Sequence, residues 1–368
     1  MSEMKQRDYS IWGPERHKAI EKGLVSAEWY QCPVPRKRMK ELMARKDGPA
    51  LRDILLWIGL LVVSGYVAFL TWGTWLAIPA FAAYGMIYSI SAVSRWHEYS
   101  HGTPFRTAWV NEVIYQICSF LILEQATNFR WTHTRHHTDT IIVGSDPEIM
   151  EPRPPKFRRI LRVFLRVTGF HLQVHTLLRQ SIGILNAVEL ELIPESQHRK
   201  LFWEARLFVL IYGGLIALCF YLGTVLPLLY VGLPAFYGFF ANTLLVLTQH
   251  MGLYEDMTDH RICARTFYTN PFLRFLYSNM NYHMEHHMFP MVPYYNLPAL
   301  HAEIKHDCPA AAPSLPSAVR ETVAALRRQK KDPTYVVPRY REFAEKNARK
   351  QASVPITVGQ GGANYDAV

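Results

Sequence analysis

Four long apolar runs constrain the fold of this 368-residue chain more than any other feature. They contain no charged side chain and cover about residues 54–72, 75–94, 207–224 and 226–248. A helix of about 20 apolar residues spans the hydrocarbon core of a bilayer, so each run is long enough to cross. Buried helices of soluble proteins usually keep a polar stripe, which these runs lack. The sequence therefore predicts four transmembrane helices in two hairpins.

Basic residues set the expected orientation of these hairpins. Seven of them precede the first run, between Arg36 and Arg52, and the turns at 73–74 and near 225 carry none. Because lysine and arginine accumulate in cytoplasmic loops, both termini and the central segment should be cytoplasmic. The net charge of +10 follows from this topology. The same surface could attract anionic lipid or an acidic protein, and nucleic acid is not needed to explain it.

The rest of the chain divides into three expected parts. Residues 1–53 form a cytoplasmic basic arm, 54–312 a membrane domain, and 313–368 a charged helical segment with a tail, from Gln351, that is expected to be disordered. Within the membrane domain, 113–123 is apolar but too short to cross, and 157–179 has the pattern of an amphipathic helix on the membrane surface. The five cysteines are scattered without a CxxC pair, which argues against disulfides, zinc ribbons and an iron–sulfur cluster.

Histidines gather in three tight groups on the expected cytoplasmic side. Eight of the 16 histidines lie in the sequences HEYSH, HTRHH and HMEHH. They are His97 and His101, then His133, His136 and His137, then His283, His286 and His287. Side chains at i, i+3 and i+4 share one face of a helix, so each group can converge on one point. Imidazoles buried together without a metal would leave ring nitrogens unpaired or bring like charges together, which is costly.

The number of histidines predicts at least two metal ions, since one zinc site uses three or four protein ligands. Imidazole also binds iron and copper, so ligand type alone does not choose the metal. An exposed, merely polar role would explain one isolated histidine but not three matched helical patterns. The predicted fold is therefore an all-α integral membrane protein whose cytoplasmic helical cap holds a histidine-rich di-metal site.

The order HxxxH, HxxHH, HxxHH, interleaved with two membrane hairpins, resembles the integral-membrane fatty acid desaturase and hydroxylase superfamily. The resemblance spans about residues 54–300 and implies a di-iron centre that uses O2 to oxidise an unactivated carbon. Box by box, it makes all eight histidines catalytic metal ligands. The surrounding sequences HGTPFRT, RWTHTRHHTDT and DPEI look closer to bacterial proteins labelled fatty acid desaturase or hydrocarbon oxygenase, including the rhizopine-oxygenase type, than to animal acyl-CoA desaturases, which implies a bacterial cytoplasmic membrane.

A ninth ligand is also implied, because the family tends to carry one more histidine near the end of the last hairpin. His250, in LTQHMG, fits that place. The competing HxxxH pair, His171 and His175, lies on the amphipathic segment and is expected at the lipid interface. On placement, His250 is the preferred ligand.

Five carboxylates lie near the boxes in sequence: Glu98, Asp139, Asp146, Glu148 and Glu285. Metal-bound imidazoles commonly donate their second N–H to such groups. Salt bridges to Arg130, Arg135 or Arg153 are an equally good explanation, and the sequence leaves both open.

The resemblance implies two iron ions as cofactor and O2 as co-substrate, with acyl-chain desaturation as the leading reaction. Hydroxylation or oxidative demethylation of a hydrocarbon or small molecule is the alternative. The chain has no haem, iron–sulfur, flavin or dinucleotide motif, so a separate electron donor, a ferredoxin, rubredoxin or cytochrome with its reductase, is expected. The other expected partners are membrane lipid and an acyl-lipid or hydrophobic substrate. A non-enzymatic metal-binding membrane protein is the second alternative, disfavoured because every box lies outside the spans.

Overall fold

The computed structural model describes residues 7–352, which form helices and contain no β-strand beyond two isolated bridges. The predicted all-α fold is confirmed for this part of the chain, and most of the tail predicted from Gln351 lies outside it. The α-helices, in chain order, are α1 Pro14–Glu21, α2 Arg36–Leu42, α3 Asp47–Leu70, α4 Ala77–Ser100, α5 Ala108–Ile122, α6 Ala126–Thr138, α7 Phe157–Phe164, α8 Val167–Ser181, α9 Ala187–Leu192, α10 Glu195–Leu222, α11 Leu226–Tyr230, α12 Pro234–Tyr237, α13 Phe239–His250, α14 His260–Cys263, α15 Pro271–Leu276, α16 His283–Met288, α17 Leu297–Ile304, α18 Leu315–Gln329 and α19 Pro338–Ala352. Two short 3₁₀ helices, Tyr294–Asn296 and Lys305–Asp307, flank α17.

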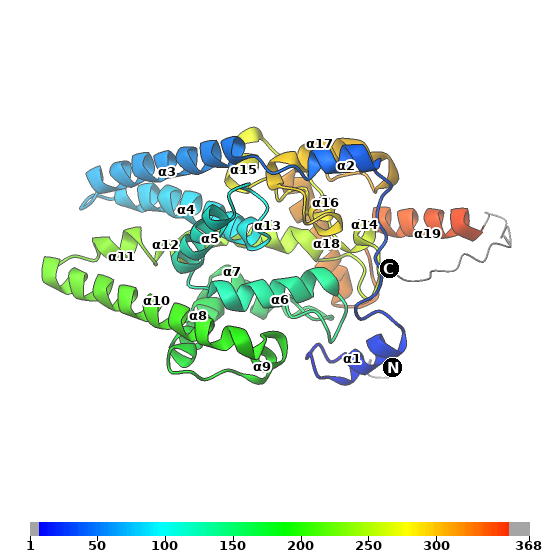
Figure 1. Ribbon diagram of the computed structural model, residues 1–368, viewed down its shortest axis with the longest axis horizontal. Helices are drawn as coiled ribbons and strands as arrows, with labels where there is room; N and C mark the ends of the chain where they lie inside the picture. The colour runs from blue at the N-terminus through cyan, green and yellow to red at the C-terminus, as the bar shows by residue number, and fades with distance from the viewer. Residues whose placement is uncertain (1–6, 353–368) are drawn as a thin grey trace, which may run out of the picture.

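Three helices of the described chain are long and apolar enough to cross a membrane: α3, with α2 preceding it, α4 and α10. α3 and α10 expose large apolar side chains along their length, for example Val62 at 65%, Leu210 at 73% and Phe220 at 84%. A soluble protein rarely exposes apolar surface on this scale, so these faces are suited to lipid. In Figure 1 the turns after α3 and α10 lie at one end of the molecule, and α6 and α16, which carry the second and third histidine boxes, lie toward the other.

The fourth predicted span, 226–248, is wrong as a single helix. The segment is divided into α11, α12 and α13, which run from 226 to 250 with breaks between them. Val231 is extended, Gly232 has a φ of +93°, and Pro234 has no N–H to donate. Apolar composition predicted this span, but the proline and glycine residues interrupt its hydrogen-bond ladder. Four continuous spans are therefore not found, although the last hairpin still returns the chain to the histidines.

Close backbone contact joins α4 to the start of α13. A Cβ built on Gly238 would lie 2.0 Å from the carbonyl oxygen of Gly85, and one on Gly85 would lie 2.2 Å from the Tyr237 ring. Small residues let helices approach closely in membranes, where lipid tails give no hydrophobic drive for association. This contact holds α13, which ends at His250, against α4, which carries His97.

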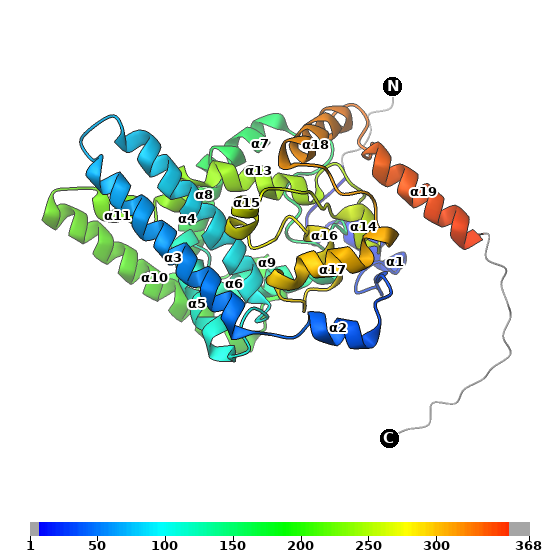
Figure 2. The same cartoon turned by 90° about the horizontal axis from the view of Figure 1, so that it is seen from above.

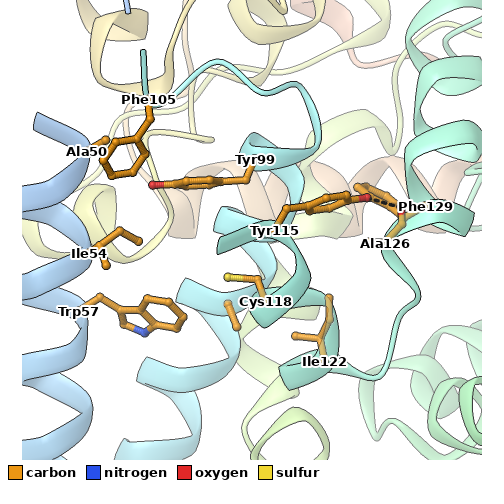
Figure 3. Close-up of a cluster of buried hydrophobic side chains, with 11 residues drawn as sticks. Ala50, Ile54, Trp57, Tyr99, Phe105, Tyr115, Cys118, Ile122, Ala126 and Phe129 are labelled. Atoms are coloured by element: carbon orange, nitrogen blue, oxygen red, sulfur yellow. Dashed lines mark hydrogen bonds between the residues drawn. The ribbon is translucent and has the colours of Figure 1, made fainter. Parts of the chain in front are cut away.

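The short apolar run predicted at 113–123 lies in α5, which packs against α3, α4 and the start of α6. Figure 3 shows the cluster that joins them, where Tyr115 donates a hydrogen bond of 2.6 Å to the carbonyl of Ala126. Trp57 from α3 and Tyr99 from α4 complete the cluster beside the first histidine box. One face of α5 is therefore buried, whereas Trp109 and Ile117 on the other face are exposed.

The predicted amphipathic helix at 157–179 is two helices, α7 and α8. The chain turns between them at Arg166, whose φ is +59°. His171 and His175 lie on α8 and are exposed. Their exposure agrees with the expected surface position of this segment.

Candidate metal centre

Helices from four parts of the chain bring the histidine boxes together. His97 lies in the last turn of α4 and His101 just after it, the second box lies in the last two turns of α6, and the third box forms α16. His250 is the last residue of α13. All nine histidines predicted as metal ligands meet here, whereas His171 and His175 do not.

The nine histidines form two groups, within each of which one ligand atom per residue lies within 4.8 Å of all the others. The first group contains His97, His101, His133, His137 and His286, and the second contains His136, His250, His283 and His287. The third box therefore contributes to both groups, with His286 in the first and His283 and His287 in the second. The geometry supplies five nitrogen donors to one point and four to the other.

Side chains from outside the boxes fix the ring orientation of several of these histidines. Nδ1–H of His136 donates to Asp146 at 2.8 Å, and Nδ1–H of His133 donates to Glu148 at 3.2 Å. Nδ1–H of His250 donates 2.8 Å to the carbonyl oxygen of Cys263. Where these oxygens accept, the proton lies on Nδ1, and Nε2 of the neutral ring carries the lone pair that can bind a metal.

The Nε2 atoms of the histidines in each group face one another. Nε2 of His137 lies 3.1 Å from Nε2 of His133 and 3.2 Å from Nε2 of His286. In the second group, Nε2 of His283 lies 2.9 Å from Nε2 of His250 and 3.0 Å from Nε2 of His287. Two nitrogen ligands of one ion, each about 2.1 Å from it and at a right angle, are about 3 Å apart. The spacing in each group matches that of two nitrogen ligands on one ion, so the donor set fits two metal ions.

Burial keeps most of these rings neutral, which is the form that binds a metal. It lowers the pKa of His133, His137, His283, His286 and His287 well below the usual value, and the charges of neighbouring histidines lower it further. His136 is the exception. Burial opposes its charge, but the carboxylates of Asp146 and Glu148 outweigh this effect and raise its pKa to about 9. The electrostatic surroundings therefore differ between the two groups.

The five candidate carboxylates differ in whether they contact a histidine of the boxes. Asp146 and Glu148 hold histidines, and Glu98 Oε1 lies 3.2 Å from Nδ1 of His286. Asp139 instead accepts from Ser145 at 2.6 Å and pairs with Arg135 at 3.2 Å, as the salt-bridge alternative predicted.

Glu285 lies inside the third box but faces away from the ring nitrogens of both groups. It accepts a hydrogen bond of 2.5 Å from Thr266 and one from His301 of α17. These contacts anchor α16 to the cap.

Two residues at the site were missed by the sequence interpretation. Nδ1 of His287 lies 3.2 Å from Oγ1 of Thr140, whose own hydroxyl donates 2.7 Å to the carbonyl of His136. The buried His260 contacts the same hydroxyl at 3.3 Å and stacks on Trp29 at 4.1 Å. Thr140 thus fixes the orientation of the His287 ring, as the carboxylates fix the orientation of other rings. A threonine and a histidine outside the boxes carry no spacing signal that could have identified them.

A cavity of about 420 Å³ reaches the second group at His136 and His250. Trp96, Phe129 and Val246 contribute apolar walls near the histidines, and Glu148 and Arg153 are among its polar residues. A mostly apolar cavity with a few polar groups is the usual form of a small-molecule site. The cavity is therefore a candidate site for a small molecule beside the second group.

Replacing Asp146 by asparagine tests the link between this carboxylate and metal binding. The variant keeps the shape but removes the charge that holds Nδ1–H of His136, so we expect about 10- to 100-fold weaker metal binding at the second group. Metal retained against a graded series of a chelator would measure it. Asp139→Asn is the matched control from the same loop, and equal metal loss in both variants would contradict the assignment.

Comparison with known proteins agrees with the geometry. The sequence model described as fatty acid desaturase matches residues 73–317, which include all nine histidines. No curated protein matches the chain. Residues 7–72 and 318–352 therefore lie outside the matched region.

Proposed function

The chain belongs to the fatty acid desaturase family, and from this premise we propose that it is an O2-dependent di-iron membrane oxidoreductase that desaturates a fatty acyl chain. Family membership supports an oxidoreductase that acts on fatty acyl chains. The observation that carries the di-metal part of the proposal is the pair of groups whose Nε2 atoms face one another at 2.9 to 3.2 Å. The membrane part is supported by three long apolar helices with exposed apolar faces.

In this proposal the nine histidines hold two iron ions, five donors on one and four on the other. Bound iron would supply the O2-dependent oxidation of an unactivated C–H bond. The protein's own groups supply the rest: Asp146, Glu148 and Thr140 keep Nε2 of their histidines deprotonated and aimed at the ions. Because these partners are already in place, the rings need little reorganisation when they bind metal.

The cavity that ends at His136 and His250 is the proposed substrate site. Trp96 and Phe129 stack with ring centroids 3.3 Å apart and form a rigid apolar wall, so they exclude water and limit how a chain can bend there. Geometry at the scale of an ångström decides between a double bond and an alcohol, because the position of the second hydrogen relative to the oxidant selects the outcome. Hydroxylation or oxidative demethylation is therefore the alternative outcome at the same site.

The remaining parts of the proposal concern the cell. The density of basic residues before α3 and between the hairpins supports a cytoplasmic location for both termini and the active site. The bacterial cytoplasmic membrane and a separate ferredoxin, rubredoxin or cytochrome as electron donor are proposed on sequence grounds. A non-enzymatic metal-binding role is the competing function.

Lipid and metabolite profiling of cells that express the wild type or His286→Ala tests the reaction. We expect new double bonds in acyl chains with the wild type and none with the variant. New hydroxyl groups or lost methyl groups, with unchanged acyl unsaturation, would replace desaturation by the alternative oxidation. Identical profiles from both proteins, in cells where the wild type carries iron, would contradict an enzymatic role.

A further inference from the structure

A groove of about 800 Å³ lies on the surface between α2 and the end of the third histidine box. Its apolar lining includes Pro33, Val34, Met39 and Met43 from the N-terminal arm and Phe289, which directly follows α16. Arg36 and Lys40 add positive charge to its rim. The groove is separate from the substrate cavity, and the residues that form its α2 wall lie outside the region matched by the family.

The groove is basic because its cations are not neutralised. Residues 36–46 contain six basic side chains and one acidic one, Glu41. Arg38 pairs with Glu41 at 3.1 Å and with Glu303 at 2.7 Å, so one arginine satisfies both nearby carboxylates. Among residues 7–352, Arg36 and Lys40 have no carboxylate partner within 4.0 Å, and both are exposed. Unpaired exposed cations around an apolar floor suit an acidic protein partner.

The floor of the groove leads directly to the metal ligands. The backbone N–H of Cys32 donates 3.2 Å to the sulfur of Met288, which is 1% exposed. Met288 is covalently bonded to His287 on one side and to Phe289, at the groove, on the other. A molecule seated in the groove would therefore be separated from a metal ligand by a single buried residue. Electron transfer slows steeply with distance, so this place is favourable for an electron carrier.

The position of α2 favours a soluble protein over lipid as the occupant. Figures 1 and 2 show α2 beside α17. Both lie beyond the first residues of α3, at the opposite end of that helix from the turn that leads to α4. A surface that lies beyond the end of a spanning helix, away from the bilayer, is open to soluble carriers. The basic helix α7, with Arg158 and Arg162 exposed, is better suited to contact lipid headgroups.

We propose that this groove between α2 and Phe289 is the docking site of an acidic one-electron carrier protein, which reduces the metal centre from the side on which Met288 lies. The proposal rests on the proposed function, since only an oxidoreductase needs such a carrier. The reaction transfers one electron per encounter from the reduced carrier to the centre, so two encounters supply the two electrons that O2 chemistry requires. Electron-transfer complexes are small and weak, and charge steering sets their rates and their dependence on salt.

Carrier binding to the metal-free, full-length protein in zwitterionic nanodiscs tests the surface independently of activity. The probes are an acidic [2Fe–2S] ferredoxin, an acidic rubredoxin and the soluble domain of a b-type cytochrome. At low salt we expect at least one to bind, and to bind the double variant Arg36→Glu, Lys40→Glu at least about tenfold more weakly. The control double variant, Lys22→Glu with Lys331→Glu, makes the same charge change at two exposed lysines outside the groove. Its affinity for the carrier should stay within about twofold of the wild-type value.

Two outcomes of this experiment would overturn the proposal. One is that no probe binds the wild type, and the other is that the control variant loses as much affinity as the groove variant. If the groove variant instead lost binding to vesicles that contain phosphatidylglycerol while its carrier binding stayed unchanged, the groove would be a lipid site.

A redox measurement separates failure of the docking site from failure of the proposed function. Reoxidation of the reduced carrier by the iron-loaded protein should slow at least about tenfold in the groove variant, whereas reduction by dithionite and methyl viologen should not change. Equal carrier rates in the variant and the wild type would overturn the docking site alone. An iron-loaded wild type that consumes no O2 with viologen would overturn the proposed function instead.

Discussion

In His286→Ala we expect the ion at the first group to bind more weakly, so that fewer than two irons per chain remain after treatment with a chelator, and the oxidised product to disappear. Nε2 of His286 lies 3.2 Å from Nε2 of His137, so the change removes one donor from the first group. Loss of one metal ligand usually abolishes a two-metal reaction, because neither ion can replace the other. We therefore expect at least about a 1000-fold loss of turnover, or about 4 kcal/mol. Elemental analysis of the purified variant and product analysis measure the two effects.

His171→Ala is the matched control for this experiment. His171 belongs to the competing HxxxH pair but is exposed on α8 and belongs to neither histidine group. It should keep two irons and full turnover. A His286→Ala protein that retains both irons and its activity would show that the first group is not a metal site, and equal losses in the two variants would show that the effect is not specific.

Gly238→Ala should destabilise the protein strongly. Its Cβ would lie 2.0 Å from the carbonyl oxygen of Gly85, and backbone on both sides leaves no flexible side chain to move away. Overpacking typically costs about 1–3 kcal/mol, and the backbone contact places this case at or above the upper end. Since α13 carries His250 beyond this contact, iron binding at the second group should weaken as well. Thermal unfolding followed by size-exclusion chromatography in detergent would measure the loss of stability.

Gly213→Ala is the control for the glycine substitution. Gly213 lies within α10, and a Cβ there would meet nothing within 4 Å. Alanine is favoured over glycine in a helix by up to about 1 kcal/mol, so this variant should be as stable as the wild type or slightly more so. If Gly238→Ala unfolded at the same temperature as the wild type, the backbones of α4 and α13 would have to be further apart than the 2.0 Å contact implies.

The sequence was sufficient to predict which histidines come together, because the spacing within each box fixes the face of the helix on which they lie. Histidines at i, i+3 and i+4 must share a helix face, so each box converges on a point wherever the helix lies. His250 was identified by its place at the end of an apolar segment, and that segment ends beside the boxes as expected. Both inferences depend on local helical geometry, which survives changes elsewhere in the fold.

Other features could not be obtained in this way. Apolarity alone predicted a continuous helix at 226–248, although Gly232 and Pro234 interrupt it, because hydropathy does not register backbone hydrogen bonding. The choice between Asp146 and Asp139 as the partner of a histidine depends on how the chain turns after α6, and sequence distance does not reveal that turn. Thr140 and His260 reach the site through tertiary contacts that have no local pattern.

The most direct test of the proposed di-iron centre is the metal content of the purified chain together with its O2 consumption under a chemical reductant. We expect about two irons per chain and O2 uptake that depends on them. Zinc alone, with no O2 consumption under the reductant, would contradict the proposal.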